Sequence, residues 1–210
     1  MMTPGVRKLA LTTHVTSSIG WLGSIATFLA LAIAGLVSLE PETVRAAYVA
    51  THLATWYVIV PFCFASFTTG VIEALGTPWG LFRHYWVLTK LLLTVLATIL
   101  LLVHTRPIDQ LAAVAVQAPL ASTNLRHLQI QLVGDASAAL FVLFVTTTLS
   151  IYKPWGMTPY GISCQFEETA AATFPEKRAR PAGRYVLIAI GAFVAIIALL
   201  HLFGIAFHAH

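Results

Sequence analysis

Charged residues are scarce in this chain: aspartate, glutamate, lysine and arginine together make up 10% of its 210 residues. A soluble domain carries about a quarter of such residues. The shortage excludes an ordinary water-soluble domain. Hydrophobic side chains account for 58% of the chain, and the mean hydropathy is +0.83, as expected for an integral membrane protein.

Sulfur-containing side chains are also few, with two cysteines and three methionines. Cys63 falls in an apolar segment and Cys164 in a polar connection, so we expect no structural disulfide between them, and their spacing matches no zinc motif. Copper(I) favours thioether and thiolate ligands. The scarcity of sulfur therefore argues against copper(I) transport.

The sequence is instead rich in long apolar runs, and a helix needs about 20 such residues to cross a bilayer. The predicted spans cover residues 9–38, 46–75, 85–104, 127–151 and 185–206. Each must be a helix, because hydrocarbon offers no water to an open backbone. Short connections favour antiparallel neighbours. We predict an all-α membrane protein with a single transmembrane domain over residues 1–210, a four-helix transmembrane bundle plus a peripheral fifth transmembrane helix.

The first run follows two basic residues, Arg7 and Lys8, which is also how a secretory signal peptide begins. The apolar core of a signal peptide is about 7–15 residues long. This run is much longer and carries polar side chains, so we interpret it as a retained first helix.

Basic residues are unevenly distributed between the connections. One side of the membrane would hold Arg7, Lys8, Arg83, Lys153, Lys177, Arg178, Arg180 and Arg184, and the other side Arg45, Arg106 and Arg126. Basic residues accumulate on the cytoplasmic side, so we predict the N-terminus inside, the C-terminus outside and a cytoplasmic loop over residues 152–183. The net charge of +4 therefore fits basic residues that orient the chain in the lipid bilayer, and it does not indicate binding to nucleic acid. The predicted location is the plasma (inner) membrane, with several passes.

Each of the first four spans carries polar or small side chains at helical spacing, which places them on one face. These faces contain His14, Ser17, Ser18, Trp21 and Ser24; His52, Thr55, Trp56, Cys63, Ser66 and Gly70; Lys90, Thr94 and His104; and His127, Gln131 and Asp135. Ionisable groups are costly in lipid and usually face a bundle interior. Four such faces predict one polar interior.

The level of each group in the membrane follows from a rise of about 1.5 Å per residue. His52, His104 and His127 fall near the outer end, whereas His14 and Lys90 fall toward the inner side. Asp135 lies nearer the middle, roughly 10 Å or more from Lys90 along the membrane normal. We therefore expect no direct pair between Lys90 and Asp135.

The outer histidines suit haem or metal chemistry, because neutral imidazole ligates iron, copper and zinc and bundles build cofactor sites between facing helices. Gln131 or Asp135 would orient such a ligand, and Asp135 equally suits a proton relay. Simpler interpretations stay open. His104 and His127 could equally lie at helix ends in contact with water, and the Lys90 side chain could extend to the lipid headgroups.

Several stretches resemble a known group of membrane proteins. His14, Trp21 and Gly23 have the His-x6-Trp-x-Gly spacing found in CopD-type copper-resistance membrane proteins and HemJ-type protoporphyrinogen oxidases. The third span, with Trp86, Lys90 and His104, and the preceding stretch PFCFASFTTGVIEALGTPWG are also similar to theirs. The stretch LSIYKPWGMTPYG is similar to an uncharacterised family of integral membrane proteins related to both groups.

This resemblance covers roughly residues 8–161 and implies that His14 is a ligand of b-type haem, with Trp21 at a cofactor-binding position. It also implies that Lys90 is a functionally required basic residue. The chain differs from the HemJ-type enzymes in its fourth span, where Gln131 and Asp135 stand in place of an Asn-Glu pair, and in its fifth span.

The leading hypothesis is a membrane-embedded b-type haem protein in electron transfer or a haem-linked oxidoreductase reaction. Its ligands would come from His14, His52, His104 and His127, with His52 and either His104 or His127 as the outer pair. Three points stay open: whether the protein is an enzyme, which membrane or soluble redox partner it uses, and whether it forms a homo-oligomer.

Two other hypotheses stay open beside it. One is a transporter of a metal ion or small solute, similar to CopD, in which Lys90 and Asp135 are the pathway residues. The other is a non-catalytic membrane subunit whose loop 152–183 docks a partner.

Overall fold

The structure is a computed structural model that describes residues 2–77, 80–117, 123–154 and 156–173. Its helices are α1 (Pro4–Val37), α2 (Pro41–Ala54), the π-helical turn η1 (Thr55–Ile59), α3 (Val60–Gly76), α4 (Tyr85–Val103), α5 (Thr105–Gln117), α6 (Thr123–Tyr152) and α7 (Pro159–Thr173). No β-strand occurs in the described part of the chain, apart from one isolated bridge between His84 and Met157. The all-α prediction is confirmed.

Four helical segments are long and apolar enough to cross a membrane: Pro4–Val37, Pro41–Gly76, Tyr85–Ala115 and Leu125–Tyr152. They correspond to the first four predicted spans and are consistent with a multi-pass membrane protein. The third is longer than predicted, because only His104 separates the end of α4 from the start of α5. The predicted fifth span, 185–206, lies outside the described residues.

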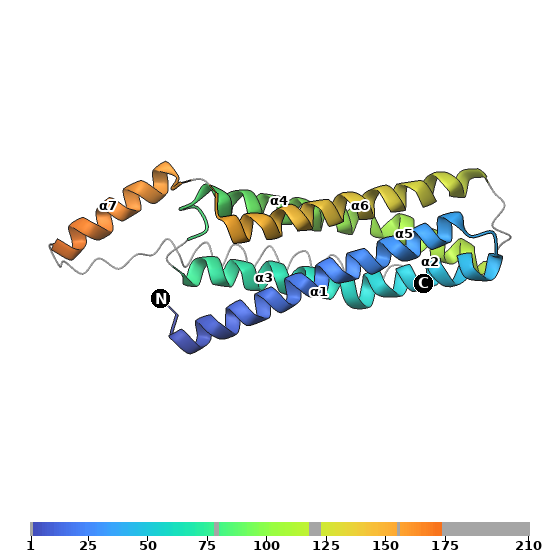
Figure 1. Ribbon diagram of the computed structural model, residues 1–210, viewed down its shortest axis with the longest axis horizontal. Helices are drawn as coiled ribbons and strands as arrows, with labels where there is room; N and C mark the ends of the chain where they lie inside the picture. Colours follow the sequence, from blue (N-terminus) through green and yellow to red (C-terminus); the bar gives the residue numbers. More distant parts are fainter. Residues whose placement is uncertain (1, 78–79, 118–122, 155, 174–210) are drawn as a thin grey trace, which may run out of the picture. The chain divides into compact units, whose positions relative to one another are not determined.

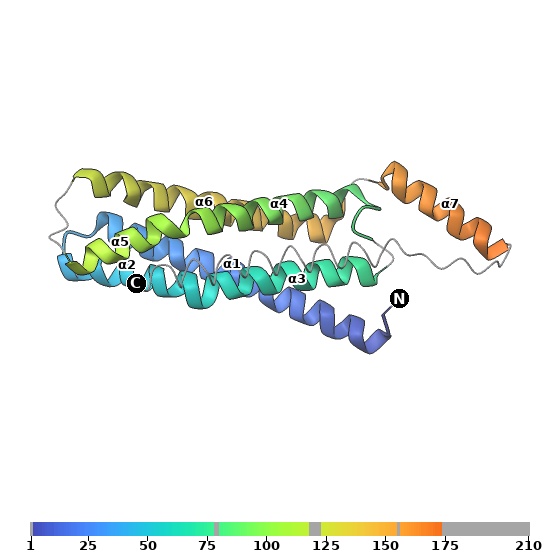
Figure 2. The ribbon, with the colours of Figure 1, turned by 180° about the vertical axis from the view of Figure 1, so that it is seen from behind.

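The chain divides into two compact units, Met1–Pro159 and Tyr160–His210. Helix α7 lies almost wholly in the second unit, and the four spans lie in the first. Within the first unit, α1 packs against α2, α3 and α6, while α4 packs against α3 and α6, and α5 against α2. Figures 1 and 2 show these helices running lengthwise beside one another. We call the end where α1 begins and α3 ends the proximal end, and the end where α1 meets α2 the distal end.

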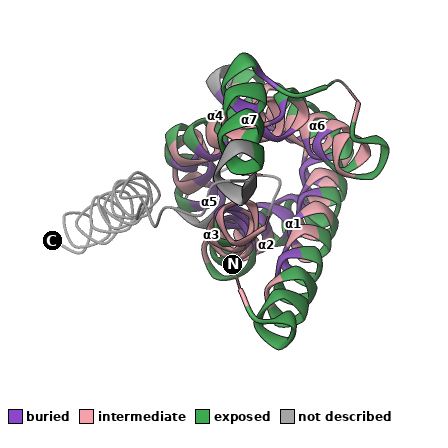
Figure 3. Ribbon diagram, turned by 90° about the vertical axis from the view of Figure 1, so that its left-hand side faces the viewer, coloured by how far each residue is buried: buried purple, intermediate pink, exposed green. Residues whose placement is uncertain are grey.

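Helix α1 presents one buried face to the bundle. A proline opens its first turn, where the missing N–H costs nothing. The buried residues, at steps of three and four, are His14, Ser17, Trp21, Ile25, Phe28, Ala32 and Gly35. Figure 3 shows buried positions on the sides of the helices that face one another. The polar face predicted for the first span therefore does point into the bundle.

The second span is interrupted by a π-helical turn just before Pro61. The N–H of Val60 bonds to the carbonyl of Thr55, five residues back instead of four. Pro61 has no N–H to continue the normal helical ladder, which explains why the turn widens here. One extra residue in a turn rotates all following side chains by about 100° relative to those before it. Residues on the two sides of η1 therefore do not share a face in the simple helical pattern.

Candidate functional site

The first group of polar side chains surrounds His14 near the proximal end. Its Nδ1 atom lies 3.0 Å from the backbone oxygen of Ser66 and 3.2 Å from Oγ1 of Thr69. Its Nε2 atom lies 3.3 Å from Nζ of Lys90. Three helices, α1, α3 and α4, thus meet at one imidazole ring whose residue is only 8% exposed.

These contacts fix the tautomer of His14. A backbone carbonyl can only accept a hydrogen bond, so the proton of a neutral ring sits on Nδ1 and is donated to Ser66. Nε2 then carries the lone pair and accepts a hydrogen bond from Lys90. A histidine whose Nδ1–H is held by a backbone carbonyl is the usual form of a metal-ligating imidazole.

The surroundings of the ring are built closely around it. A Cβ atom at Gly70 would lie 2.8 Å from Cε1 of His14, so only glycine leaves room for the ring. Glu73, one turn further along α3, interacts electrostatically with Lys90 and with Lys153. We call His14, Ser66, Thr69, Gly70, Glu73 and Lys90 the proximal cluster.

The outer histidines are in three different environments. His52 Nδ1 lies 2.9 Å from Oδ1 of Asp109, which also accepts a hydrogen bond of 3.0 Å from Nε1 of Trp56. His104 donates from Nδ1 to the Leu100 carbonyl at 2.7 Å, and its Nε2 lies 3.2 Å from Oδ2 of Asp135.

His127 is exposed on α6, and Gln131 is half-buried one turn later. Within the described residues, no group of three or more histidine, cysteine, aspartate or glutamate side chains is placed to hold a metal ion. His52 and His104 contact different aspartates, and the pairing of His52 with His104 or His127 stays a prediction. Lys90 and Asp135 also lie apart, each beside a different histidine.

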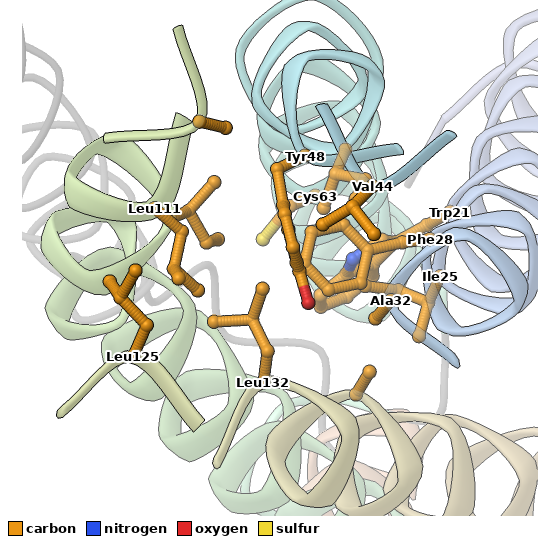
Figure 4. Close-up of a cluster of buried hydrophobic side chains, with 14 of the residues drawn as sticks. Trp21, Ile25, Phe28, Ala32, Val44, Tyr48, Cys63, Leu111, Leu125 and Leu132 are labelled. Carbon is orange, nitrogen blue, oxygen red and sulfur yellow. The ribbon is translucent and has the colours of Figure 1, made fainter. Parts of the chain in front are cut away.

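A cavity of about 140 Å³ lies between α1, η1, α4 and α6, and we call it the distal cavity. Its wall is mostly apolar, with many leucine and alanine side chains, and includes Trp21, His104 and Asp135. Figure 4 shows Trp21 reaching from α1 into the adjoining cluster of buried side chains, with its indole nitrogen directed away from the α1 backbone. An engineered apolar cavity of about 150 Å³ holds one benzene ring. The distal cavity therefore has room for one ring but not for a four-ring porphyrin.

Several residues of these sites were not predicted as such from the sequence. Asp109 falls in the connection between the predicted spans 85–104 and 127–151, where no sequence pattern indicates a contact with His52. The Ser66 carbonyl and Gly70 act through the backbone and through the lack of a side chain, which no side-chain motif reveals. Glu73 lies near the end of the second span, and its interaction with Lys90 depends on how α3 and α4 pack.

Comparisons with known proteins give no further guide to the site. The chain matches no protein-family model, no curated protein and no solved structure.

Proposed function

We propose that the protein is a membrane-embedded b-type haem protein that acts in electron transfer, with His14 as a ligand of the haem iron. The observation that carries this proposal is the orientation of the His14 ring. The Ser66 carbonyl accepts a hydrogen bond from Nδ1–H and leaves the lone pair on Nε2, which faces Nζ of Lys90. The resemblance of His14, Trp21 and Gly23 to the haem-binding HemJ-type motif points to the same residue.

The donor chemistry at His14 fits haem iron. Haem is commonly held by a histidine imidazole, and hydrogen bonds to that histidine tune its properties. Coordination at Nε2 requires the Lys90 side chain to leave this nitrogen, where it now donates a hydrogen bond. Lys90 would then keep its positive charge beside Glu73, in keeping with the required basic residue that the resemblance implies. When bound, the haem supplies one-electron chemistry.

The outer histidines support a haem site less well. His52 and His104 each face a carboxylate, and His127 is exposed. The distal cavity beside His104 is too small for a porphyrin unless the helices separate. We assign the haem to the proximal cluster because Nε2 of His14, unlike Nε2 of His104, does not contact a carboxylate. A porphyrin there would have to displace side chains packed against the ring. Following the distribution of basic residues, we place the proximal end on the cytoplasmic side. The electron partner would be a membrane or soluble redox protein or a lipid-soluble carrier.

An absorption spectrum tests this function. The full chain is expressed with ample haem, purified in nanodiscs and measured oxidised and after reduction with dithionite. We expect a Soret band that shifts on reduction and that is lost in His14→Ala but retained in His127→Ala. A wild-type protein without a Soret band would contradict the proposal, and loss in His127→Ala alone would move the haem to the outer histidines.

A further inference from the structure

The connection that follows α6 folds back onto the residues that precede α4. We call residues 156–158 of this connection the strap. The N–H of Thr158 donates to the carbonyl of Arg83 at 2.9 Å, and its Oγ1 donates to the carbonyl of Phe82 at 2.6 Å. A longer bond of 3.5 Å joins the N–H of Tyr85, the first residue of α4, to the first carbonyl of the strap. The strap therefore holds the start of α4 through backbone groups.

This contact between distant segments is buried. Thr158 is 7% exposed and His84, which forms a bridge with Met157, is 9% exposed. A hydroxyl buried without a partner is costly, so the side chain of Thr158 favours the arrangement in which Oγ1 meets the carbonyl of Phe82. The strap is thus a specific attachment of the chain after α6 to the turn before α4.

Helix α4 has little other support on the side of His14. It packs mainly against α6, beside which it lies in Figure 1, and less extensively against α3 and α5. It has no packing of comparable extent against α1, the helix that carries His14. The 3.3 Å approach of Nζ of Lys90 to Nε2 of His14 is therefore made by one long side chain rather than by two closely packed helices.

The position of Lys90 depends on where α4 begins. Lys90 follows Tyr85 after little more than one helical turn, about 7.5 Å along the axis. A helix this short between the two points moves as a rigid rod, so a displacement of the first turn displaces Lys90 with it. The strap, which holds that first turn, thereby determines whether Nζ reaches the His14 ring.

We propose that Thr158 is a positioning residue of the proximal cluster: through the strap, it holds α4 where Lys90 donates a hydrogen bond to Nε2 of His14. The connection after α6 is thereby coupled to a buried histidine on α1, and a molecule that displaced the strap would free Nε2. The consequence for haem rests on the proposed function, because Lys90 must leave Nε2 before iron binds there. The contact itself does not depend on haem.

Solid-state NMR of the full-length chain tests this coupling, with ¹⁵N-labelled histidine, in lipid vesicles and without added haem. The readout is the ¹⁵N chemical shift of His14 Nε2, which changes with the hydrogen bond that this nitrogen accepts. The His14 signals are identified by their absence in His14→Gln, and Lys90→Met gives the position of the Nε2 signal without the lysine donor. We expect Thr158→Val to move the signal toward that position and Thr158→Ser, which keeps the hydroxyl, to restore the wild-type position.

The matched control is Thr146→Val. Thr146 is 6% exposed, and its hydroxyl donates to the Leu143 carbonyl within α6 itself. This variant should keep the wild-type signal. Should Thr158→Val not fold, Thr158→Ala also lacks the hydroxyl and carries the same expectation.

Three results would overturn the proposal. One is an unchanged Nε2 signal in the variants of Thr158 that lack the hydroxyl. Another is an equal shift in Thr146→Val, which would show a general loosening of the bundle. The third is a wild-type signal at the Lys90→Met position, which would contradict the contact between Lys90 and His14. Because no haem is added, these outcomes are separate from a missing Soret band, which bears on the proposed function alone.

Discussion

The proximal cluster and the distal cavity differ in how their polar atoms are satisfied. Both ring nitrogens of His14 have partners, and Gly70 is pressed against the ring. Among the residues that line the distal cavity, Nε1 of Trp21 has no hydrogen-bond partner within the described part of the chain, and Oδ2 of Asp135 has only its 3.2 Å contact with His104. A fully bonded, closely packed group holds one residue in a fixed orientation. A haem ligated by His14 would therefore have to displace Lys90 from Nε2 and the side chains packed against the ring.

The largest expected effect on stability comes from a substitution that breaks the proximal cluster. Lys90→Met removes the donor to His14 Nε2 and the positive charge beside Glu73. A buried polar group that loses its partner costs up to about 3 kcal/mol, and more when it is charged. We expect a lower thermal unfolding midpoint in nanodiscs, with most of the loss recovered in Lys90→Arg. Equal midpoints for wild type and Lys90→Met would show that the cluster contributes nothing to stability.

The next effect comes from adding a single methyl group. Gly70→Ala places a Cβ atom 2.8 Å from a histidine ring that hydrogen bonds hold in place. Overpacking of this kind costs about 1–3 kcal/mol. Gly134→Ala is the matched control, because nothing lies within 4 Å of its new Cβ and alanine favours the helix. We expect opposite shifts of the unfolding midpoint, and parallel shifts would contradict the close fit around His14.

Filling the distal cavity should raise the unfolding midpoint, whereas overpacking the proximal cluster should lower it. Ala136→Leu extends an apolar side chain into free space, and filling a cavity commonly stabilises a protein by about 0.5–2 kcal/mol. Its unfolding midpoint should rise in the absence of added ligand. A fall of the size seen for Gly70→Ala would mean that the cavity is not free to accept a side chain.

The smallest effect is expected for the pair of His52 and Asp109 at the distal end. Each side chain is 35% exposed, and exposed ion pairs contribute about 0–1 kcal/mol. We expect His52→Gln to change the unfolding midpoint by less than any substitution above. If His52→Gln lowered the unfolding midpoint more than Lys90→Met does, the distal end would contribute more to stability than the proximal cluster.

The four long apolar helices could be predicted from the sequence, because hydropathy and length mark them. The predicted levels did not anticipate that His104 and Asp135 would be in contact. The buried face of α1 followed directly from the spacing of His14, Ser17 and Trp21. Depth does not determine which way a side chain points around its helix axis. The π-helical turn at Thr55–Ile59 rotates α3 relative to α2, so the simple pattern could not predict that Ser66 would meet His14 while His52 would meet Asp109.

The most direct test of the proposed haem site compares two histidines that are held in the same way. His14 and His104 both donate from Nδ1 to a backbone carbonyl, but only His14 lies in the proximal cluster. The measurement is the ratio of bound haem to protein in His14→Ala and His104→Ala, purified side by side. We predict that His14→Ala loses the haem and His104→Ala keeps it. Retention in His14→Ala together with loss in His104→Ala would contradict the assignment.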